Sequence, residues 1–196
     1  NVAQGRVELA ETTVDEDAEI DEHLDATAAA LDRIESIIDH TLTLAREGET
    51  VGDTEPVSLA TVATDSWETV ETGAATLTVE TDREVSADPD RLRNLFENLA
   101  RNAVEHAGPD VTIRVGDLDD GFYVADDGPG IPESVADDLF EPGQSSAEGN
   151  TGFGLAIVQE IASAHGWTVE ATASDEGGAR FEIRGIKRHY APLPEP

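Results

Sequence analysis

Hydrophobic residues recur with helical spacing between residues 88 and 107. Asp88 is a suitable N-cap and Pro89 suits the first turn, so a helix is predicted to begin there. The apolar positions lie three or four residues apart and share one face: Leu92, Leu95, Phe96, Leu99 and Ala103. This face is predicted to be buried.

The opposite face of the same helix is polar and rich in amides. It carries Asn94, Asn98, Asn102 and Glu105. Asparagine competes for backbone hydrogen bonds inside helices, so asparagines one turn apart need a reason. From this helix alone, a solvated face and a binding site explain the pattern equally well.

Shorter periodic segments surround this helix. Helices are predicted at residues 59–72 and 152–165, and strands at 57–59, 76–81, 84–87, 111–115, 121–126, 167–173 and 179–184. The last two strands form a hairpin through residues 175–178. Helices and strands interleave without a repeated βαβ unit, which indicates an α+β fold: a two-layer α/β sandwich with a mixed, mostly antiparallel sheet.

Residues 1–50 are predicted to form a separate helical hairpin. An apolar stripe runs along residues 19–46, and two helices cannot bury such stripes alone. Packing against a second copy of the chain is the first explanation, and packing on the adjoining domain is the second. Gly-rich residues 51–56 form a linker, residues 57–188 the second domain, and residues 189–196 a Pro-rich tail.

The composition is strongly acidic. The formal net charge is −31, from 43 acidic and 12 basic residues, and Lys187 is the one lysine. Such self-repulsion is tolerable where concentrated salt screens it, and the pattern resembles proteins of salt-accumulating archaea. An acidic surface that mimics nucleic acid or binds a basic partner is the alternative, whereas binding to DNA or anionic lipid is disfavoured.

The sequence also limits the chemistry and the location. It contains no cysteine, so disulfides and thiolate metal sites are excluded. No apolar run is long enough to span a bilayer, and no signal peptide is visible. We therefore expect a soluble piece in a cytoplasm of high salt content, which could be the cytosolic part of a membrane-associated protein.

Four segments in order resemble the nucleotide-binding boxes of the GHKL (Bergerat) fold, in the form found in sensor histidine kinases. The asparagine helix is similar to the N box, and residues 126–130 (Asp-Asp-Gly-Pro-Gly) and 149–155 (Gly-Asn-Thr-Gly-Phe-Gly-Leu) to the glycine boxes. Residues 139–142 (Leu-Phe-Glu-Pro) match an F box. The resemblance covers roughly residues 57–186 and implies helices on one face of the sheet.

The resemblance implies a site for ATP and Mg²⁺. Asp126 would accept a hydrogen bond from the adenine amine, and Asn102 would be the metal ligand. Asn98 and Asn102 are the implied catalytic residues, and residues 133–151 the lid over the nucleotide. The implied ATP-binding residues are Asn98, Arg101, Asn102, His106, Asp126, Gly128, Gly130, Ile131, Phe140, Thr151, Gly152, Phe153, Gly154 and Leu155.

Two features of the boxes bear on activity. In hydrolysing relatives a glutamate general base matches the position of Asn98, and an amide cannot accept a proton from water, which favours a kinase over an ATPase. Glu105 stands where many relatives carry lysine, and Asn150 where they often carry glycine. These departures weaken the expectation of tight ATP binding.

Residues 1–50 resemble the dimerisation and phosphotransfer hairpin of the same kinases. The phosphoaccepting histidine of that family precedes the position of Asn1, and neither His23 nor His40 matches it. We therefore expect no phosphoacceptor in this chain, a homodimer through the hairpin, a response regulator receiver domain as partner, upstream sensor domains and no nucleic acid. A catalytically silent nucleotide-binding or dimerisation module is the alternative function, and a GHKL ATPase a weaker third.

Overall fold

The computed structural model describes residues 54–70, 72–132, 135–136, 138–141 and 152–186. The helical hairpin expected at residues 1–50, most of the linker, most of the lid and the tail at 189–196 lie outside these ranges. Thr151 and Asn150 also lie outside them. The domain boundaries, the dimer hairpin and the lid therefore remain predictions.

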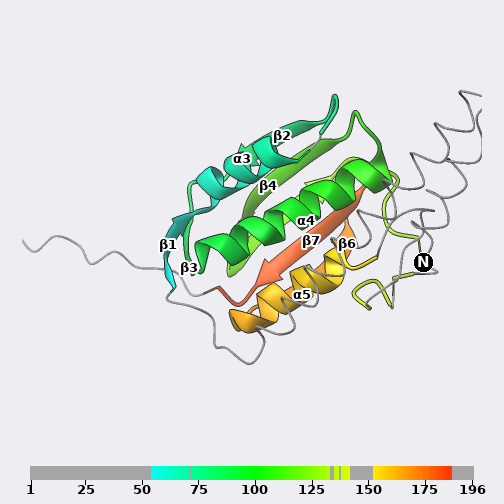
Figure 1. Cartoon of the computed structure of the whole chain (residues 1–196). Helices are drawn as coiled ribbons and strands as arrows, with labels where there is room; N and C mark the ends of the chain where they lie inside the picture. Colours follow the sequence, from blue (N-terminus) through cyan, green and yellow to red (C-terminus); the bar gives the residue numbers. More distant parts are fainter. Residues whose placement is uncertain (1–53, 71, 133–134, 137, 142–151, 187–196) are drawn as a thin grey trace, which may run out of the picture.

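Three helices and seven strands make up the described part of the chain (Figure 1). In chain order they are β1 (Glu55–Ser58), α3 (Leu59–Thr69), β2 (Thr76–Glu80), β3 (Glu84–Ala87), α4 (Pro89–Ala107), β4 (Thr112–Leu118), β5 (Gly121–Asp126), α5 (Gly154–Ala164), β6 (Thr168–Ala173) and β7 (Ala179–Arg184).

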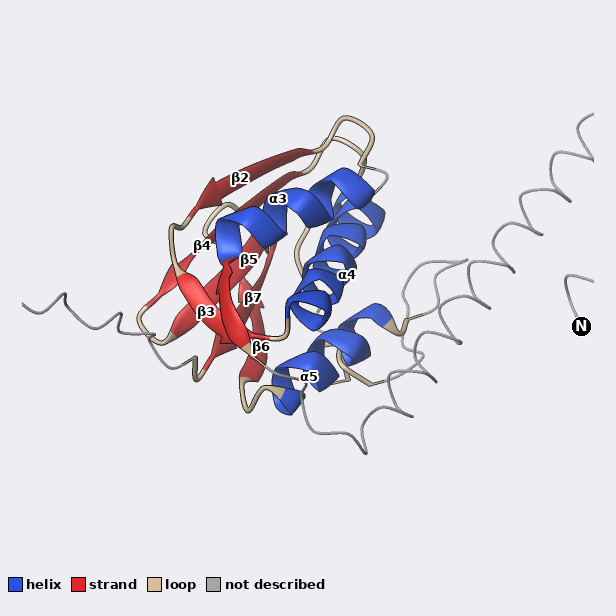
Figure 2. Ribbon diagram, turned by 60° about the vertical axis from the view of Figure 1, so that its left-hand side comes forward, coloured by secondary structure: helices blue, strands red, loops and turns tan. Residues whose placement is uncertain are grey.

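The main sheet has five strands in the order β2-β4-β5-β7-β6. The β2–β4 pair is parallel and the other three pairs are antiparallel, while β1 and β3 form a small antiparallel sheet of their own. All three helices lie on the same side of the five-stranded sheet (Figure 2). The predicted two-layer sandwich with a mixed, mostly antiparallel sheet is confirmed.

Helix α4 is the centre of the helical layer. Oδ1 of Asp88 accepts hydrogen bonds from the backbone N–H groups of Asp90 and Arg91, at 3.1 and 3.2 Å, which confirms the predicted N-cap. The apolar face of α4 is buried against the sheet, where Phe96 stacks on Phe122 of β5 with 5.5 Å between ring centroids. Helices α3 and α5 pack on either side of α4.

Several element boundaries differ by one to three residues from the sequence-based predictions. Helix α3 ends at Thr69, three residues early, because Val70 already has extended backbone angles (φ −92°, ψ 138°). Helix α5 begins at Gly154, because Gly152 has a positive φ of 65° that a right-handed helix cannot include. Strand β4 continues beyond residue 115 to Leu118, because its last residues pair with the start of β5 in a hairpin. These differences leave the order of the elements unchanged.

Candidate functional site

Asn98 is buried, although the sequence places it on the polar face of α4. Its side chain is 8% exposed, and its Nδ2 donates to the backbone carbonyl of Asn94 at 2.8 Å and to Oδ1 of Asn94 at 2.6 Å. A buried amide is stable only when it is paired in this way. The solvated-face explanation is therefore wrong for Asn98.

The start of α5 lies against this amide. A Cβ atom on Gly154, the first residue of α5, would come within 3.2 Å of Oδ1 of Asn98. Phe153 occupies the N-cap position, and no side chain in the described ranges caps this end of the helix. The first backbone N–H groups of α5 and the positive end of its dipole are thus brought beside Asn98, an arrangement that suits an anionic group.

Asp126 is a buried carboxylate at the end of β5. It is 7% exposed, and its Oδ1 accepts from the backbone N–H of Gly128 at 2.9 Å and of Ala179 at 3.0 Å. Burial raises the pKa of Asp126 above its ordinary value, as does the charge of Asp127, while the two hydrogen bonds and His106 act in the opposite direction. Oδ2 takes part in neither bond, so it is the oxygen that could accept from a ligand.

Glycines around Asp126 are required by contacts within the protein. A Cβ on Gly128 would collide with the methyl group of Ala107 at the end of α4, and Gly130 has a φ of 79°. Gly178 is a further such glycine that the sequence did not single out, since a Cβ there would collide with the backbone oxygen and Oδ1 of Asp126. A double glycine in a hairpin turn is an ordinary turn signal, so nothing local distinguished Gly178.

The neighbouring Asp127 is exposed and hydrogen-bonds to the start of β4. Its Oδ1 accepts from the backbone N–H of Thr112 at 2.8 Å, and this hydrogen bond is the main cause of a lowered pKa of Asp127. The exposed Asp127 therefore fixes the beginning of β4, whereas the buried Asp126 faces the site.

The other predicted site residues lie along α4 and the two loops. Asn102 is half-buried on α4, while Arg101 and His106 are exposed. Leu155 is buried in the core, so only its backbone is available to a ligand, and Ile131 and Phe140 pack against the core at its edge. Gly152 and Phe153 are half-buried before α5, and Thr151 lies outside the described residues.

The donors available for a metal ion are few. Among the described residues, no three His, Cys, Asp or Glu side chains lie together in a way that could hold a metal. A Mg²⁺ ion at Asn102 would therefore need further oxygens from water and from a bound phosphate chain, as is usual for Mg²⁺.

The described part is an α/β sandwich with a buried carboxylate at one end of α4 and an uncapped helix start beside the middle of α4. This combination is the one expected of an ATP-binding domain. The profile of the family described as "Histidine kinase-, DNA gyrase B-, and HSP90-like ATPase" matches residues 87–188, just over half of the chain. The chain belongs to this family.

Its relatives include sensor histidine kinases. The chain is 38% identical over 102 residues to the sensor histidine kinase ZraS of Klebsiella oxytoca, covering 50% of this chain and 22% of ZraS. It is 38% identical over 114 residues to the sensory histidine kinase/phosphatase NtrB of Rhodobacter capsulatus, covering 49% of this chain and 32% of NtrB. The chain thus spans about a fifth to a third of these curated relatives.

Solved structures of histidine kinases share the fold. The mycobacterial sensor histidine kinase MprB gives a TM-score of 0.60 at 27% identity, covering 68% of this chain and 99% of that one. The ATP-binding domain of PrrB from Mycobacterium tuberculosis gives 0.54 at 28% identity, covering 70% and 100%. These likenesses confirm that the described part has the fold of histidine kinase ATP-binding domains.

One further finding concerns membranes. Within the described ranges, none of the helices combines the length and apolar character needed to cross a bilayer.

Proposed function

We propose that this chain is the ATP-binding catalytic region of a two-component sensor histidine kinase. It transfers the γ-phosphoryl group of ATP to a histidine other than the five in this sequence, for relay to an aspartate of a response regulator. The observation that carries the proposal is the position of buried Asn98 beside the start of α5, with buried Asp126 beyond the end of the same helix.

The site has two ends, joined by α4. Asn98 and Ala107 are nine residues apart, which is about 14 Å along a helix axis. A Cβ on Gly154 would meet the first of these residues, and a Cβ on Gly128 would meet the second. This separation suits an extended nucleotide rather than a single small ion.

Asp126 would bind adenine. Its Oδ1 is held by two backbone N–H groups, so Oδ2 can accept from the exocyclic amine of the base. Ile131 and Phe140, at the edge of the core, would contact the flat faces of the base.

The start of α5 would bind the phosphates. The backbone N–H groups near Gly154 would bind the phosphates in place of basic side chains, which are few in this acidic chain. Arg101 and His106 on α4 would be further contacts. Asn102 would supply a neutral oxygen to Mg²⁺, which bridges the phosphates and neutralises their charge during transfer.

Phosphoryl transfer to an imidazole suits this site better than hydrolysis of ATP. Asn98 is an amide and cannot take a proton from water. The adjacent Glu97 accepts a hydrogen bond from Oγ1 of Thr69 on α3 at 3.0 Å, so its carboxylate is directed toward α3. A histidine nucleophile carries its own lone pair and needs no such base.

The proposal extends to the whole protein. Residues 1–50 would form the dimerisation hairpin, with a receiver domain as partner and sensor domains elsewhere in the polypeptide. The net charge of −31 supports a halophilic archaeal type that works in a cytoplasm of high salt content and does not bind nucleic acid.

Calorimetry of ATP binding with Mg²⁺ in molar KCl tests the proposal. We expect saturable binding that is at least about tenfold weaker in Asn102→Ala and Asp126→Asn, since each loses a ligand contact worth roughly 1.4 kcal/mol or more. Arg93→Ala, an exposed residue of the same helix, is the control. Binding would justify adding a histidine-bearing hairpin in trans and measuring phosphotransfer.

Absence of binding by a folded wild-type chain would contradict the proposal. It would favour a dimerisation module with a degenerate nucleotide site, for which Glu105 in place of a phosphate-binding lysine is the supporting observation.

A further inference from the structure

The turn between β6 and β7 packs directly against Asp126. Gly178 leaves no room for a side chain beside the backbone oxygen and Oδ1 of Asp126, and the next residue, Ala179, donates its N–H to Oδ1 at 3.0 Å. A Cβ on Gly130 would lie 3.2 Å from the carbonyl oxygen of Gly177. The turn therefore contacts the first glycine box at both Asp126 and Gly130.

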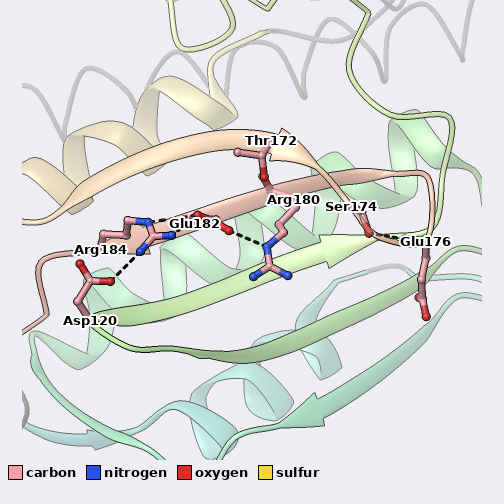
Figure 3. Close-up of polar contacts among 7 residues, drawn as sticks. All are labelled: Asp120, Thr172, Ser174, Glu176, Arg180, Glu182 and Arg184. Atoms are coloured by element: carbon pink, nitrogen blue, oxygen red, sulfur yellow. Dashed lines mark hydrogen bonds and ion pairs between the residues drawn. The ribbon is translucent and has the colours of Figure 1, made fainter.

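This turn is fixed by its own hydrogen bonds. The N–H of Ser174 donates to the carbonyl of Gly178 at 2.8 Å, and the N–H of Gly177 donates to the carbonyl of Ser174 at 3.1 Å. The N–H of Glu176 donates to Oγ of Ser174 at 3.4 Å (Figure 3). The turn should therefore move as a unit.

An ion pair ties the turn to β4. Nη2 of Arg114 lies 2.8 Å from Oε1 of Glu176. Arg114 stands between the buried Ile113 and Val115 in β4, so its side chain is on the face of the sheet opposite the helices. Nε of Arg114 is buried without a hydrogen-bond partner and lies 3.8 Å from Oε1 of Glu80. Of these two ion pairs of the guanidinium, the one with Glu176 is therefore the shorter.

One small cavity lies beside the ion pair and Asp126. It has a volume of about 40 Å³, and its lining includes Arg114, Asp126 and Glu176.

Building on the proposed function of Asp126, we propose that Arg114 and Glu176 are positioning residues of the nucleotide site. They hold the β6–β7 turn in place, and the turn sets the carboxylate of Asp126 through Gly178 and Ala179. Breaking the pair loosens the turn and weakens recognition of the adenine amine, while the phosphate end at α5 is unaffected.

Comparing ATP with purine riboside triphosphate, which lacks the 6-amino group, isolates this effect. We expect Glu176→Gln to lower the preference for ATP about threefold and Gly178→Ala at least tenfold, with little change in binding of the amine-free nucleotide. Glu170→Gln on β6, which removes the same charge from the same hairpin, should leave the preference unchanged. Equal weakening of both nucleotides in Glu176→Gln would mean a merely structural pair and would overturn the inference.

An NMR titration of the Asp126 carboxyl without nucleotide provides a second readout. In the wild type, the hydrogen bond from the N–H of Ala179 lowers the pKa of Asp126. Loosening the turn weakens this bond, so the pKa of Asp126 should rise in Gly178→Ala and, to a smaller extent, in Glu176→Gln. If the wild type binds no ATP, the proposed function fails while this titration still tests the turn. An unchanged titration in Glu176→Gln would overturn the role of the ion pair, even if Gly178→Ala does not fold.

Discussion

Gly154 begins α5 directly against the side chain of Asn98, with 3.2 Å between Oδ1 of the amide and the place that a Cβ on Gly154 would occupy. Asn98 cannot move away easily, because its Nδ2 is held by two hydrogen bonds to Asn94. Helices α4 and α5 therefore meet at a point where one has no side chain and the other presents a buried amide.

Substituting Gly154→Ala should weaken ATP binding about five- to tenfold without unfolding the chain. The methyl group crowds Asn98, while alanine favours the helical conformation by up to about 1 kcal/mol and so offsets the crowding. Calorimetry and thermal unfolding on the same sample separate the two effects. Ser163→Ala, at an exposed position of the same helix, is the control. A variant with wild-type ATP affinity would show that the contact has no part in binding.

The Asp126→Asn variant should keep its stability at neutral pH while losing at least about tenfold in ATP affinity. The pKa of Asp126 is raised from 3.8, mainly by burial, so the folded state binds the proton more tightly than the unfolded state does. The wild type therefore loses some stability as pH rises from 3.8 through the higher pKa of the folded state, because the buried carboxyl must ionise. Asparagine does not ionise and avoids this loss. Its Oδ1 can accept both backbone bonds, which turns Nδ2, a donor, toward the adenine amine.

Denaturation at pH 7 and calorimetry test these two expectations together. A clear loss of stability in Asp126→Asn would show that the charge of Asp126 is needed for folding. It would contradict the assignment of this carboxylate to adenine binding.

His165 should make stability depend on pH. Its Nε2 accepts from the N–H of Asp88 at 3.1 Å and its Nδ1 lies 2.7 Å from the carbonyl of Ile161, a pairing that requires the neutral ring. Burial, aided by the charge of Arg91, lowers the pKa of His165 below 6.5. The contribution to stability is therefore complete above pH 6.5 and is lost as pH falls through 6.5 toward the lower folded value.

Urea denaturation at pH 7.5 and 5.5 in molar KCl measures this dependence. His165→Gln does not titrate and should show a smaller difference between the two pH values than the wild type. His106→Gln, at an exposed position, should retain the wild-type difference. Equal differences in His165→Gln and the wild type would rule out His165 as the cause.

Arg83→Lys should destabilise the chain by about 1–2 kcal/mol. The guanidinium donates to the carbonyls of Gly121 and Leu118, at 2.7 and 2.6 Å, and so closes the β4–β5 hairpin. An ammonium group cannot donate to both with the same geometry. Chemical denaturation provides the measurement, with the exposed Arg93→Lys as control, and equal stability of the two variants would contradict the role of Arg83.

The uncovered side of the sheet carries a second charged group, centred on Glu182. Glu182 lies between Arg180 and Arg184, with Oε1 2.8 Å from Nε of Arg180 and Oε2 2.7 Å from Nη2 of Arg184 (Figure 3). Burial acts to raise the pKa of Glu182, but the two arginines outweigh it and the pKa is lowered. Arg180 also stacks over Tyr123, 3.6 Å from the ring centroid.

Local patterns along the chain were enough to predict the elements and their order. The cap at Asp88, the apolar stripe of α4 and the alternation along β5 and β7 are local signals, since each depends on spacing within a few residues. The burial of Asp126 was likewise predictable. The order of the nucleotide boxes implied that Asp126 binds the adenine amine, which requires a buried carboxylate.

Which polar residues are buried, and what each glycine accommodates, depend on how the elements pack together. Asn98 looks like a surface residue until α5 packs beside α4, and Gly128 is required by Ala107, a residue of a preceding helix. Gly178 lies 52 positions after Asp126 and still leaves no room for a side chain against it. Such requirements come from close packing between segments that are distant in sequence, and local spacing carries no record of those contacts.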